Sequence, residues 1–332
     1  MVNLTAVYGT LQGELGRFEK AFETVLKSQD GVSRRLYEKQ AKLKGKRLRP
    51  ILLFLSARAT GQIKPIHYNL ATIIELIHNA TLVHDDVLDD AVLRRHLPTF
   101  NQRWGNETAI LFGDLLFSNA FRTCAEIESG EALKVLSKTA QEMCYGELTH
   151  TARKFDLSMK ENEYLQIITD KTASLFSAAC YLGAFFATPD KKLHLALQGY
   201  GRAFGMAYQI RDDYYDLVSN EETEGKTTGL DLTKGKITLP LIMALRRLAK
   251  RGQKRLGNLI SEGVSLSNPA KAGQLLKLLD SCNALADCRK KICHYISRAK
   301  EHLKNIPGSD YQKLLVHTLE NIANENNISG KG

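Results

Sequence analysis

Two short runs of aspartate are the clearest candidates for chemistry in this sequence. They read DDVLD at residues 85–89 and DDYYD at residues 212–216. On an α-helix, residues four apart lie on one face, so the first and last aspartate of each run point in the same direction. Carboxylates held this close repel one another unless a cation lies between them. Mg²⁺ suits such a site, because it takes one or two carboxylates and completes its shell with water and phosphate oxygens.

A solvated acidic helix face is the usual alternative for a single run of this kind, but the flanking residues argue against it. Ile74, His78 and Thr81 precede Asp85 at intervals of three or four residues on a strongly apolar helix. The second run directly follows the apolar segment FGMAYQI at residues 204–210. We therefore predict that both aspartate clusters face an internal cavity.

Basic residues accompany both clusters along the chain. The segment GKRLRP at residues 45–50, called the basic segment below, places three cations before a predicted helix. The other basic residues near the clusters are Arg94, Arg95, Lys171, Lys226, Lys234 and Lys236. Arginine binds phosphate through paired N–H groups, and lysine acts as a point charge. Each of these residues alone is more often a solvated surface group, but the set, interleaved with two metal sites, predicts a diphosphate pocket.

The elements that must position these residues are predicted to be helices. Apolar residues recur at helical spacing in segments 66–90, 133–150, 161–187, 193–218 and 239–250. Strand-like alternation is hard to find, and the 7 prolines mostly separate the helical stretches. No internal repeat, heptad pattern or long linker divides the sequence. We therefore predict one all-α domain over residues 1–323, followed by a disordered tail at residues 324–332.

The composition sets wider limits on partners and location. The 332 residues carry 46 Lys and Arg against 36 Asp and Glu, a formal net charge of +10, which favours anionic partners without choosing among them. The 6 cysteines form no CxxC pair, so buried thiols are expected rather than disulfides or metal ligands. The first residues lack the features of a signal peptide, and the apolar run at 172–189 is interpreted as a core helix. We expect a cytoplasmic protein.

The order of these motifs resembles that of the trans-prenyl (polyprenyl) diphosphate synthases. The shared pattern comprises Gly45-Lys46-x-x-Arg49-Pro50, His78, Asp85-Asp86-x-x-Asp89, Arg94-Arg95, Lys171-Thr172, Gln209-Ile210-x-Asp212-Asp213-x-x-Asp216, Lys226 and Gly235-Lys236. It spans the chain from Gly45 to Pro240. Two Asp-rich motifs with basic partners in this order are highly specific for the family.

The resemblance implies a fold, a metal and a set of ligands. The fold would be a single-domain bundle of about ten or more helices around a deep central cavity, usually assembled as a homodimer. The main ligands of about three Mg²⁺ ions would be Asp85, Asp89 and Asp212, with Asp86, Asp213 and Asp216 alongside. The implied contacts of an allylic diphosphate are Arg94, Lys171, Thr172, Gln209 and Lys226. Those of isopentenyl diphosphate are Lys46, Arg49, His78 and Arg95.

The implied reaction is a head-to-tail condensation of these two substrates. Metals and cations would stabilise the departing allylic diphosphate, isopentenyl diphosphate would attack the resulting cation, and a proton would be lost. An apolar cavity would exclude water, which would quench the cation, and would hold the growing chain. Transient contact with a membrane surface is expected for product release, and nucleic acid is not expected as a partner.

Product length is predicted from the residues just before the first cluster. In the resembled family, bulky side chains four or five residues before the first aspartate stop elongation early. Thr81 and Ala80 occupy these positions and are small, which predicts a medium- or long-chain product. Phe117 and Phe121 could form a deeper floor, although ordinary core packing is the simpler explanation for both.

Three positions depart from the family pattern. His96-Leu97 follows the paired arginines where Gly and then Lys or Gln are usual, Tyr208 stands in place of a common Phe, and His150 in place of a common Gln. None of these differences removes a predicted ligand. They bear on loop geometry and substrate preference.

Three other functions share part of the pattern. A terpene cyclase would carry an Asn/Ser/Glu triad where this chain has the aspartates of 212–216. A non-catalytic subunit of a heteromeric synthase would usually have lost the carboxylates. A nucleic-acid-binding module would need exposed cations with aromatic residues for stacking, whereas these cations alternate with carboxylates that repel phosphate in the absence of metal.

Overall fold

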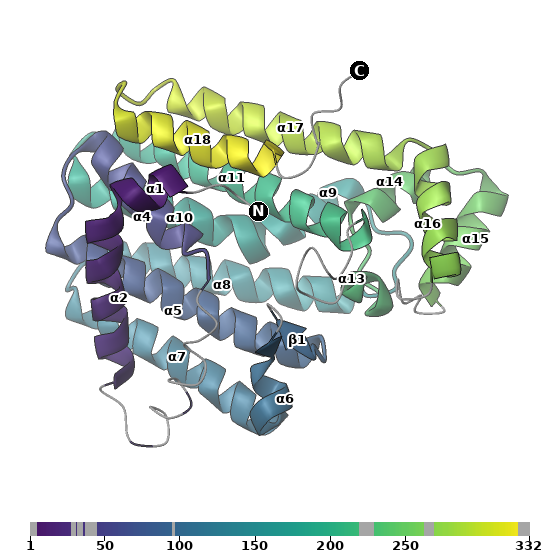
Figure 1. Cartoon of the computed structure of the whole chain (residues 1–332), viewed down its shortest axis with the longest axis horizontal. Coiled ribbons are helices and arrows are strands. Elements are labelled where there is room, and N and C mark those ends of the chain that lie inside the picture. The colour runs from purple at the N-terminus through teal and green to yellow at the C-terminus, as the bar shows by residue number, and fades with distance from the viewer. Residues whose placement is uncertain are drawn as a thin grey trace.

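The described part of the chain is almost entirely helical (Figure 1). The computed structural model describes residues 5–27, 45–94, 97–218, 229–261 and 269–324, together with Gly31 and Leu36. The helices are α1 (Thr5–Thr10), α2 (Gln12–Lys27), α4 (Leu48–Thr60), α5 (Pro65–Leu88), α6 (Phe100–Trp104), α7 (Asn106–Glu126), α8 (Gly130–Ala152), α9 (Glu161–Ile168), the π-helical turn η1 (Thr169–Ala173), α10 (Ser174–Ala187), α11 (Lys191–Val218), α13 (Leu230–Thr233), α14 (Leu239–Arg247), α15 (Lys250–Ser261), α16 (Pro269–Ser281), α17 (Ala284–Leu303) and α18 (Asp310–Asn324). The predicted all-α bundle is confirmed.

Most of the predicted helices agree with the observed ones, and the differences are local. The predicted segments 66–90, 133–150 and 193–218 correspond to α5, α8 and α11. The segment 161–187 is interrupted by the π-helical turn η1, and the segment 239–250 contains all of α14 and the first residue of α15. An antiparallel pair of two-residue strands, β1 (Leu93–Arg94) and β2 (Leu97–Pro98), was not predicted.

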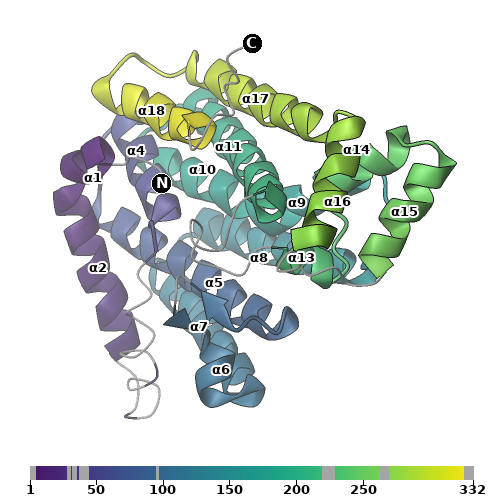
Figure 2. The same cartoon turned by 45° about the vertical axis from the view of Figure 1, so that its right-hand side comes forward.

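The apolar helices α10 and α11 lie in the middle of the bundle, with α17 and α18 on one side and α5 and α7 on another (Figures 1 and 2). Glycines allow the central helices to approach closely. A Cβ on Gly183 would lie 2.3 Å from the carbonyl oxygen of Leu53 in α4, and one on Gly201 would lie 2.5 Å from that of Phe176. These contacts fix α10 against α4 and α11.

A buried histidine joins the start of α5 to α10. His67 is fully buried, and its Nδ1 accepts a hydrogen bond of 2.9 Å from the backbone N–H of Lys64. Its Nε2 lies 3.0 Å from the carbonyl oxygen of Gly183, so the proton is assigned to Nε2. Burial lowers the pKa of His67, outweighing the opposing effect of these backbone contacts. The ring is therefore held in its neutral form.

The remaining sequence predictions at this level concern the chain end and membrane spans. Of the predicted tail at residues 324–332, only Asn324 is described, as the last residue of α18, and the rest lies outside the described residues. None of the described helices is both long enough and apolar enough to cross a bilayer.

Candidate active site

Both aspartate clusters line one cavity of about 750 Å³. Asp85, Asp86 and Asp89 reach it from the C-terminal end of α5. Asp212, Asp213 and Asp216 reach it from the last turns of α11. The structure thus brings together two groups that lie far apart in the sequence, as predicted.

The first cluster is held by cations from three other parts of the chain. Asp86 is buried and accepts hydrogen bonds from Arg94, at 2.9 Å from Nε and 2.7 Å from Nη2. Burial raises the pKa of Asp86 even though the Arg94 guanidinium opposes that shift. Lys171 lies 3.4 Å from Asp85, and Lys236 donates to Asp89 at 2.6 Å. Each carboxylate of the first cluster therefore contacts one cation.

The second cluster is organised by hydrogen bonds to Asp213. This buried carboxylate accepts from the hydroxyl of Tyr164 at 2.5 Å and from Nε2 of Gln209 at 2.7 Å. The hydroxyl of Thr172 donates to Oε1 of Gln209 at 2.7 Å. Burial, with the nearby charge of Asp231, raises the pKa of Asp213 to about 7. Two residues predicted to contact an allylic diphosphate, Thr172 and Gln209, thus also orient a predicted metal-site carboxylate.

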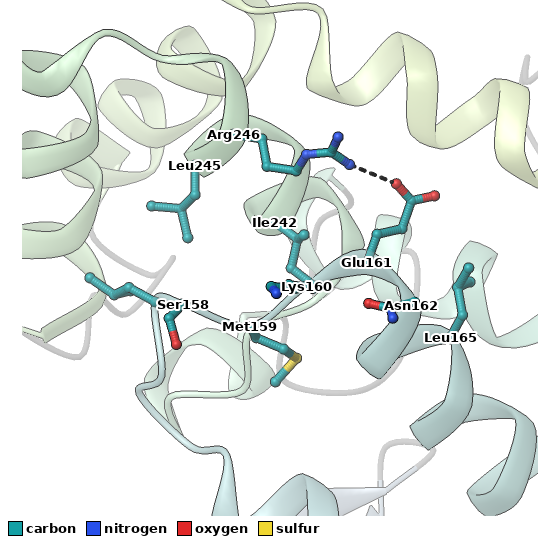
Figure 3. A pocket seen from close by; sticks show the side chains of 10 residues that line it. Ser158, Met159, Lys160, Glu161, Asn162, Leu165, Ile242, Leu245 and Arg246 are labelled. Carbon is teal, nitrogen blue, oxygen red and sulfur yellow. Dashed lines mark hydrogen bonds and ion pairs between the residues drawn. The ribbon is translucent and has the colours of Figure 1, made fainter.

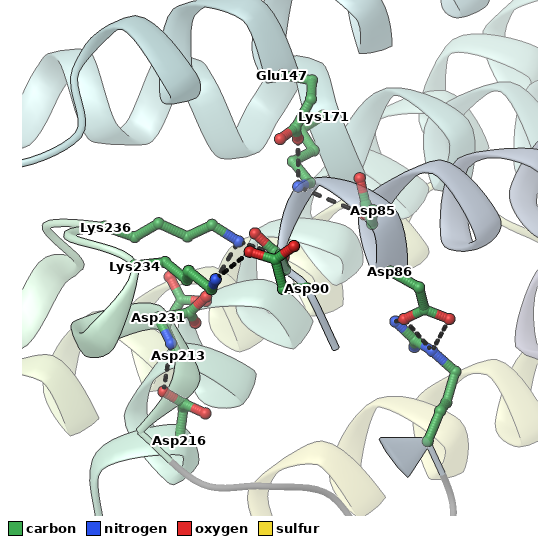
Figure 4. Close-up of polar contacts among 12 residues, drawn as sticks. Asp85, Asp86, Asp90, Glu147, Lys171, Asp213, Asp216, Asp231, Lys234 and Lys236 are labelled. Carbon is green, nitrogen blue, oxygen red and sulfur yellow. Dashed lines mark hydrogen bonds and ion pairs between the residues drawn. The ribbon is translucent and has the colours of Figure 1, made fainter. Parts of the chain in front are cut away.

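Lysines lie between the carboxylates on both sides of the cavity (Figure 4). Lys171 is in the π-helical turn η1 and forms ion pairs with Asp85 and Glu147. Lys236 lies 3.3 Å from Asp231 in addition to its bond to Asp89. Burial alone would lower the pKa of each lysine, but the carboxylates outweigh it and the pKa of each is raised. Both ammonium groups therefore stay charged within the site.

The carboxylate arrangement fits Mg²⁺ that binds together with a phosphate ligand. Among the described residues, no three carboxylate, histidine or cysteine side chains form a group that would hold a metal alone. Mg²⁺ in such sites normally takes one or two protein carboxylates and the oxygens of a substrate. Within the same described residues, Oδ1 of Asp89 is buried without a hydrogen-bond partner, which leaves a hard oxygen donor for a cation.

The basic segment forms another part of the same cavity wall. Lys46, Arg49 and His78 all line the cavity. The Arg49 guanidinium carbon lies 4.3 Å from the ring centroid of Phe176, and burial lowers the Arg49 pKa. In the described part of the chain, Nε of Arg49 is buried and has no hydrogen-bond partner. An anion bound at this point would supply the missing acceptor.

Four predicted site residues are not placed on this wall. Arg95 and Lys226 lie outside the described residues. Ala80 is fully buried in the core and does not line the cavity, although Thr81 does. Phe117 lines the cavity, whereas Phe121 stacks on Phe117 from an exposed position on α7.

Sequence reasoning gave no role to several residues of the site. Glu147 forms an ion pair with Lys171. Its position three residues before His150, on a helix that contributes to the cavity, could have indicated a role in the site. Asp231 and Tyr164 had no such signal, because their proximity to the clusters arises only from the tertiary fold. His150 lines the cavity, and neither ring nitrogen has a hydrogen-bond partner among the described residues. Burial and the charges of Lys171 and Lys236 lower its pKa to about 4.

A second hollow of about 620 Å³ lies between the start of α9 and α14 (Figure 3). Its lining includes Met159, Leu165 and Ile242, and Glu161 at its edge binds Arg246 at 3.2 Å and Lys291 at 2.7 Å. No predicted site residue is found among the described residues that line it. It does not contribute to the site of the two aspartate clusters.

Comparisons with known proteins agree with this geometry. A family model described as polyprenyl synthetase matches residues 32–279. The chain is 37% identical over 274 residues to an all-trans-nonaprenyl-diphosphate synthase (geranyl-diphosphate specific) of Rhodobacter capsulatus, covering 82% of this chain and 83% of that protein. It is 35% identical over 277 residues to a short chain isoprenyl diphosphate synthase of Methanothermobacter thermautotrophicus, with 82% and 83% covered.

A solved structure with the same fold is the polyprenyl synthase from Caulobacter crescentus CB15, complexed with calcium and isoprenyl diphosphate. It superimposes with a TM-score of 0.90 at 31% sequence identity, covering 97% of each chain. The match of the family model extends over most of the sequence and includes both aspartate clusters. The chain therefore belongs to the polyprenyl synthetase family.

Proposed function

We propose that this chain condenses isopentenyl diphosphate with an allylic prenyl diphosphate in successive trans head-to-tail additions. The product is a medium- or long-chain polyprenyl diphosphate, and diphosphate is released at each addition. The observation that carries the proposal is the single cavity in which two aspartate clusters lie with the basic segment on its wall.

The carboxylates would hold the metal, and the cations would hold the diphosphates. Asp85, Asp89 and Asp212 are the proposed main ligands, supported by Asp86, Asp213 and Asp216. When bound, about three Mg²⁺ ions would supply Lewis-acid stabilisation of the leaving diphosphate. Arg94, Lys171, Thr172, Gln209 and Lys226 would bind the allylic diphosphate. The calcium and isoprenyl diphosphate of the Caulobacter protein support this assignment of cation and ligand chemistry.

The second diphosphate would be held by Lys46, Arg49, His78 and Arg95. The unpartnered Nε of Arg49 supports this role, because a buried guanidinium gains most from a bidentate anion. With isopentenyl diphosphate fixed here, its double bond would be oriented toward the allylic carbon, and the proton released would pass to the departing diphosphate. Orientation of both partners removes much of the entropic barrier to the reaction.

The apolar part of the cavity would exclude water and accept the growing chain. Thr81, Phe117 and Met143 line the cavity, and the small side chain of Thr81 leaves room for elongation. The small side chain at residue 81 supports a long product, such as the nonaprenyl diphosphate named for the Rhodobacter relative. It argues against a short product like that of the Methanothermobacter relative. Excluding water protects the allylic cation from conversion to an alcohol.

We further propose that two copies of the chain associate through α7 and α8. Large apolar side chains are exposed along both helices, including Leu111 and Phe121 on α7 and Tyr145 and Leu148 on α8. An exposed apolar face of this kind is typical of an oligomer interface. A cytoplasmic location, with transient contact to a membrane surface when the product leaves, completes the proposal. Light scattering would test the dimer, and a monomer at micromolar concentration would contradict it.

The decisive experiment is incubation with farnesyl diphosphate, isopentenyl diphosphate and Mg²⁺, followed by chromatography of the hydrolysed products. We expect a ladder of alcohols that ends beyond twenty carbons, roughly five carbons apart. Omission of isopentenyl diphosphate should abolish all products. Cyclic products formed from farnesyl diphosphate alone would instead identify a terpene cyclase, and elongation that stops at about twenty carbons would disprove the long-chain assignment.

A further inference from the structure

The N-terminal helix α2 contacts the basic segment at Arg47, which forms an ion pair with Glu19 of α2. The family model begins at residue 32, after α2 ends, so α2 lies outside the matched part of the chain. We infer that Glu19 and Arg47 are positioning residues, through which α2 holds Lys46 and Arg49 in place for isopentenyl diphosphate. This inference rests on the proposed function of that pocket.

The backbone of Arg47 has an unusual conformation at a critical point. Arg47 precedes the first residue of α4 and has φ 50° and ψ 33°, in the left-handed region. A residue with a side chain is uncommon there and persists only when its surroundings hold it. This conformation separates two cavity-lining residues, Lys46 and Arg49, which lie on either side of it. The contacts that hold Arg47 therefore also set the positions of both cations.

Those contacts come from two carboxylates, and they use all three nitrogens of the Arg47 guanidinium. Nε and Nη2 of Arg47 donate to the two oxygens of Glu19 at 2.9 and 3.4 Å. Nη1 donates to Oε1 of Glu75 in α5 at 2.7 Å. The Arg47 side chain is only 11% exposed and that of Glu75 only 4%. These two carboxylates raise the Arg47 pKa despite its burial, so the guanidinium stays charged.

The aromatic residues of α2 complete the enclosure. The guanidinium carbon of Arg47 lies 5.1 Å from the ring centroid of Phe22 and 5.7 Å from that of Phe18, and both rings are buried. A cation over aromatic faces gains further attraction when it is removed from water. From α1, the hydroxyl of Tyr8 donates to the carbonyl oxygen of Lys46 at 2.8 Å. Two N-terminal helices thus hold consecutive residues of the basic segment.

Glu75 links this network to the substrate side. Its charge acts on Arg49 as well as on Arg47, and all three residues line the cavity. While Arg47 binds Glu75, the negative charge of Glu75 is largely compensated. If Arg47 moved away, Glu75 would pair more strongly with Arg49 and compete with a diphosphate for that guanidinium. Glu19 prevents this by fixing the opposite side of Arg47.

A second ion pair on α2 provides a matched control. Glu14 accepts from Nη2 of Arg58 at 2.5 Å, so it also joins α2 to α4. Neither Glu14 nor Arg58 lines the cavity. The variants Glu19→Gln and Glu14→Gln each weaken one α2–α4 ion pair, but only the first acts on the basic segment.

The first measurement is steady-state kinetics with each substrate varied in turn. Glu19→Gln should raise KM for isopentenyl diphosphate about tenfold, the scale of one lost charged hydrogen bond, while KM for farnesyl diphosphate changes less than about twofold. Glu14→Gln should leave both KM values within about twofold of wild type. Tyr8→Phe, a milder change, should raise KM for isopentenyl diphosphate in the same direction. If Glu19→Gln and Glu14→Gln changed this KM equally, Glu19 would only attach α2 to the rest of the protein, and the inference would be wrong.

The second measurement does not depend on activity. Hydrogen exchange of the unliganded protein reports on the first turn of α4, where the N–H of Ile51 donates to the carbonyl oxygen of Arg47 at 3.0 Å. The amides of Ile51 and Leu52 should exchange at least about fivefold faster in Glu19→Gln than in Glu14→Gln. Unchanged exchange in Glu19→Gln would reject the positioning role. If wild type proved inactive with prenyl diphosphates, the proposed function would fail, and the exchange contrast would still decide whether Glu19 fixes the basic segment.

Discussion

At the scale of single residues, the site contains its own counterions. Lys171 and Lys236 each lie between two carboxylates, and Arg94 neutralises the buried Asp86. Binding of a metal and a diphosphate would therefore exchange one set of ionic contacts for another. These contacts offset part of the repulsion among the carboxylates that line the cavity.

The aspartates should be essential for turnover. Asp85→Ala and Asp212→Ala should each lower kcat by at least about a hundredfold, because each removes a ligand for charge that develops on the leaving diphosphate. Chelation of Mg²⁺ should abolish activity in wild type. The matched control is Asp310→Ala, which removes a side chain that is 87% exposed and paired only with the neighbouring Lys313 in the described structure. Near-normal turnover in both cluster variants would exclude the proposed metal site.

The two diphosphate pockets should respond differently to substitution. Arg49→Ala should raise KM for isopentenyl diphosphate by about tenfold or more, since a bidentate contact to phosphate is lost. Lys171→Ala should act mainly on the allylic substrate. Steady-state kinetics with both substrates would separate these effects, with the exposed Arg202→Ala as control. An increase confined to the allylic KM in Arg49→Ala would reverse the assignment.

At this scale the sequence predicted which residues line the cavity better than the contacts that they make with one another. The four-residue spacing within each aspartate run was enough to place both runs on helix faces, and both reach the cavity. The bond from Lys236 to Asp89 joins residues 147 positions apart, and no local pattern encodes such a distance. Ala80 lies beside Thr81 in sequence but faces the core, because neighbouring residues of a helix point in directions about 100° apart.

At the scale of secondary structure, long helices were predictable and their interruptions were not. The apolar periodicity of α5 and α11 extends over many turns, and the predicted bounds lie within about two residues of the observed ones. The single extra residue of the π-helical turn η1 is not visible in the apolar pattern of residues 161–187, so the sequence indicated one continuous helix. The pair β1 and β2 has only two residues in each strand, too few to show alternation.

The contact between α5 and α10 predicts a specific dependence of stability on pH. The pKa of His67 is lowered by burial, so the folded protein binds this proton less readily than the unfolded chain, whose pKa is near 6.5. The contribution of His67 to stability is therefore present above pH 6.5 and is lost as the pH falls toward the folded value.

His67→Gln keeps a donor for the carbonyl oxygen of Gly183 and removes the titration. Thermal unfolding followed from about pH 7.5 to about pH 5.5 should show a smaller decrease in Tm for this variant than for wild type. His294→Gln, which changes an exposed histidine on α17, should retain the wild-type pH dependence. A decrease in Tm that is the same for His67→Gln and wild type would show that other groups account for the acid sensitivity.

At the scale of the whole molecule, the cavity wall should determine product length. Thr81 lies about one helical turn, roughly 5 Å, before Asp85 and faces the cavity. Thr81→Tyr should block the passage and shorten the products, while the first condensation and metal binding remain largely intact. Product chromatography at equal turnover, with Thr10→Tyr on α1 as control, would test this. If Thr81→Tyr made the same products as a long-chain wild type, the limit on length would be set elsewhere, with Phe117 the next residue to test.

The extent of the domain and its assembly belong to this scale too. A domain boundary at residue 323 stays a prediction, because the structure describes nothing beyond Asn324. The proposed dimer face on α7 is adjacent to the cavity, since exposed Phe121 stacks on the cavity-lining Phe117 at a centroid distance of 6.4 Å. A second copy on this face would therefore cover the outer side of the same wall.

The π-helical turn η1 also fixes the number of residues that the chain must have between α9 and α10, a requirement that no side-chain substitution would reveal. A π turn holds one residue more than an α turn, so deleting a single codon within residues 169–173 would allow an unbroken α-helix from α9 to α10. That helix would be more regular, but α9 would be rotated by about 100° relative to α10. Tyr164 would then point away from Asp213, although every predicted ligand outside the turn would remain in the sequence. The extra residue in the π turn therefore sets the rotation of α9 about the helix axis relative to α10. This rotation directs Tyr164 toward Asp213 and is part of how the active site is built.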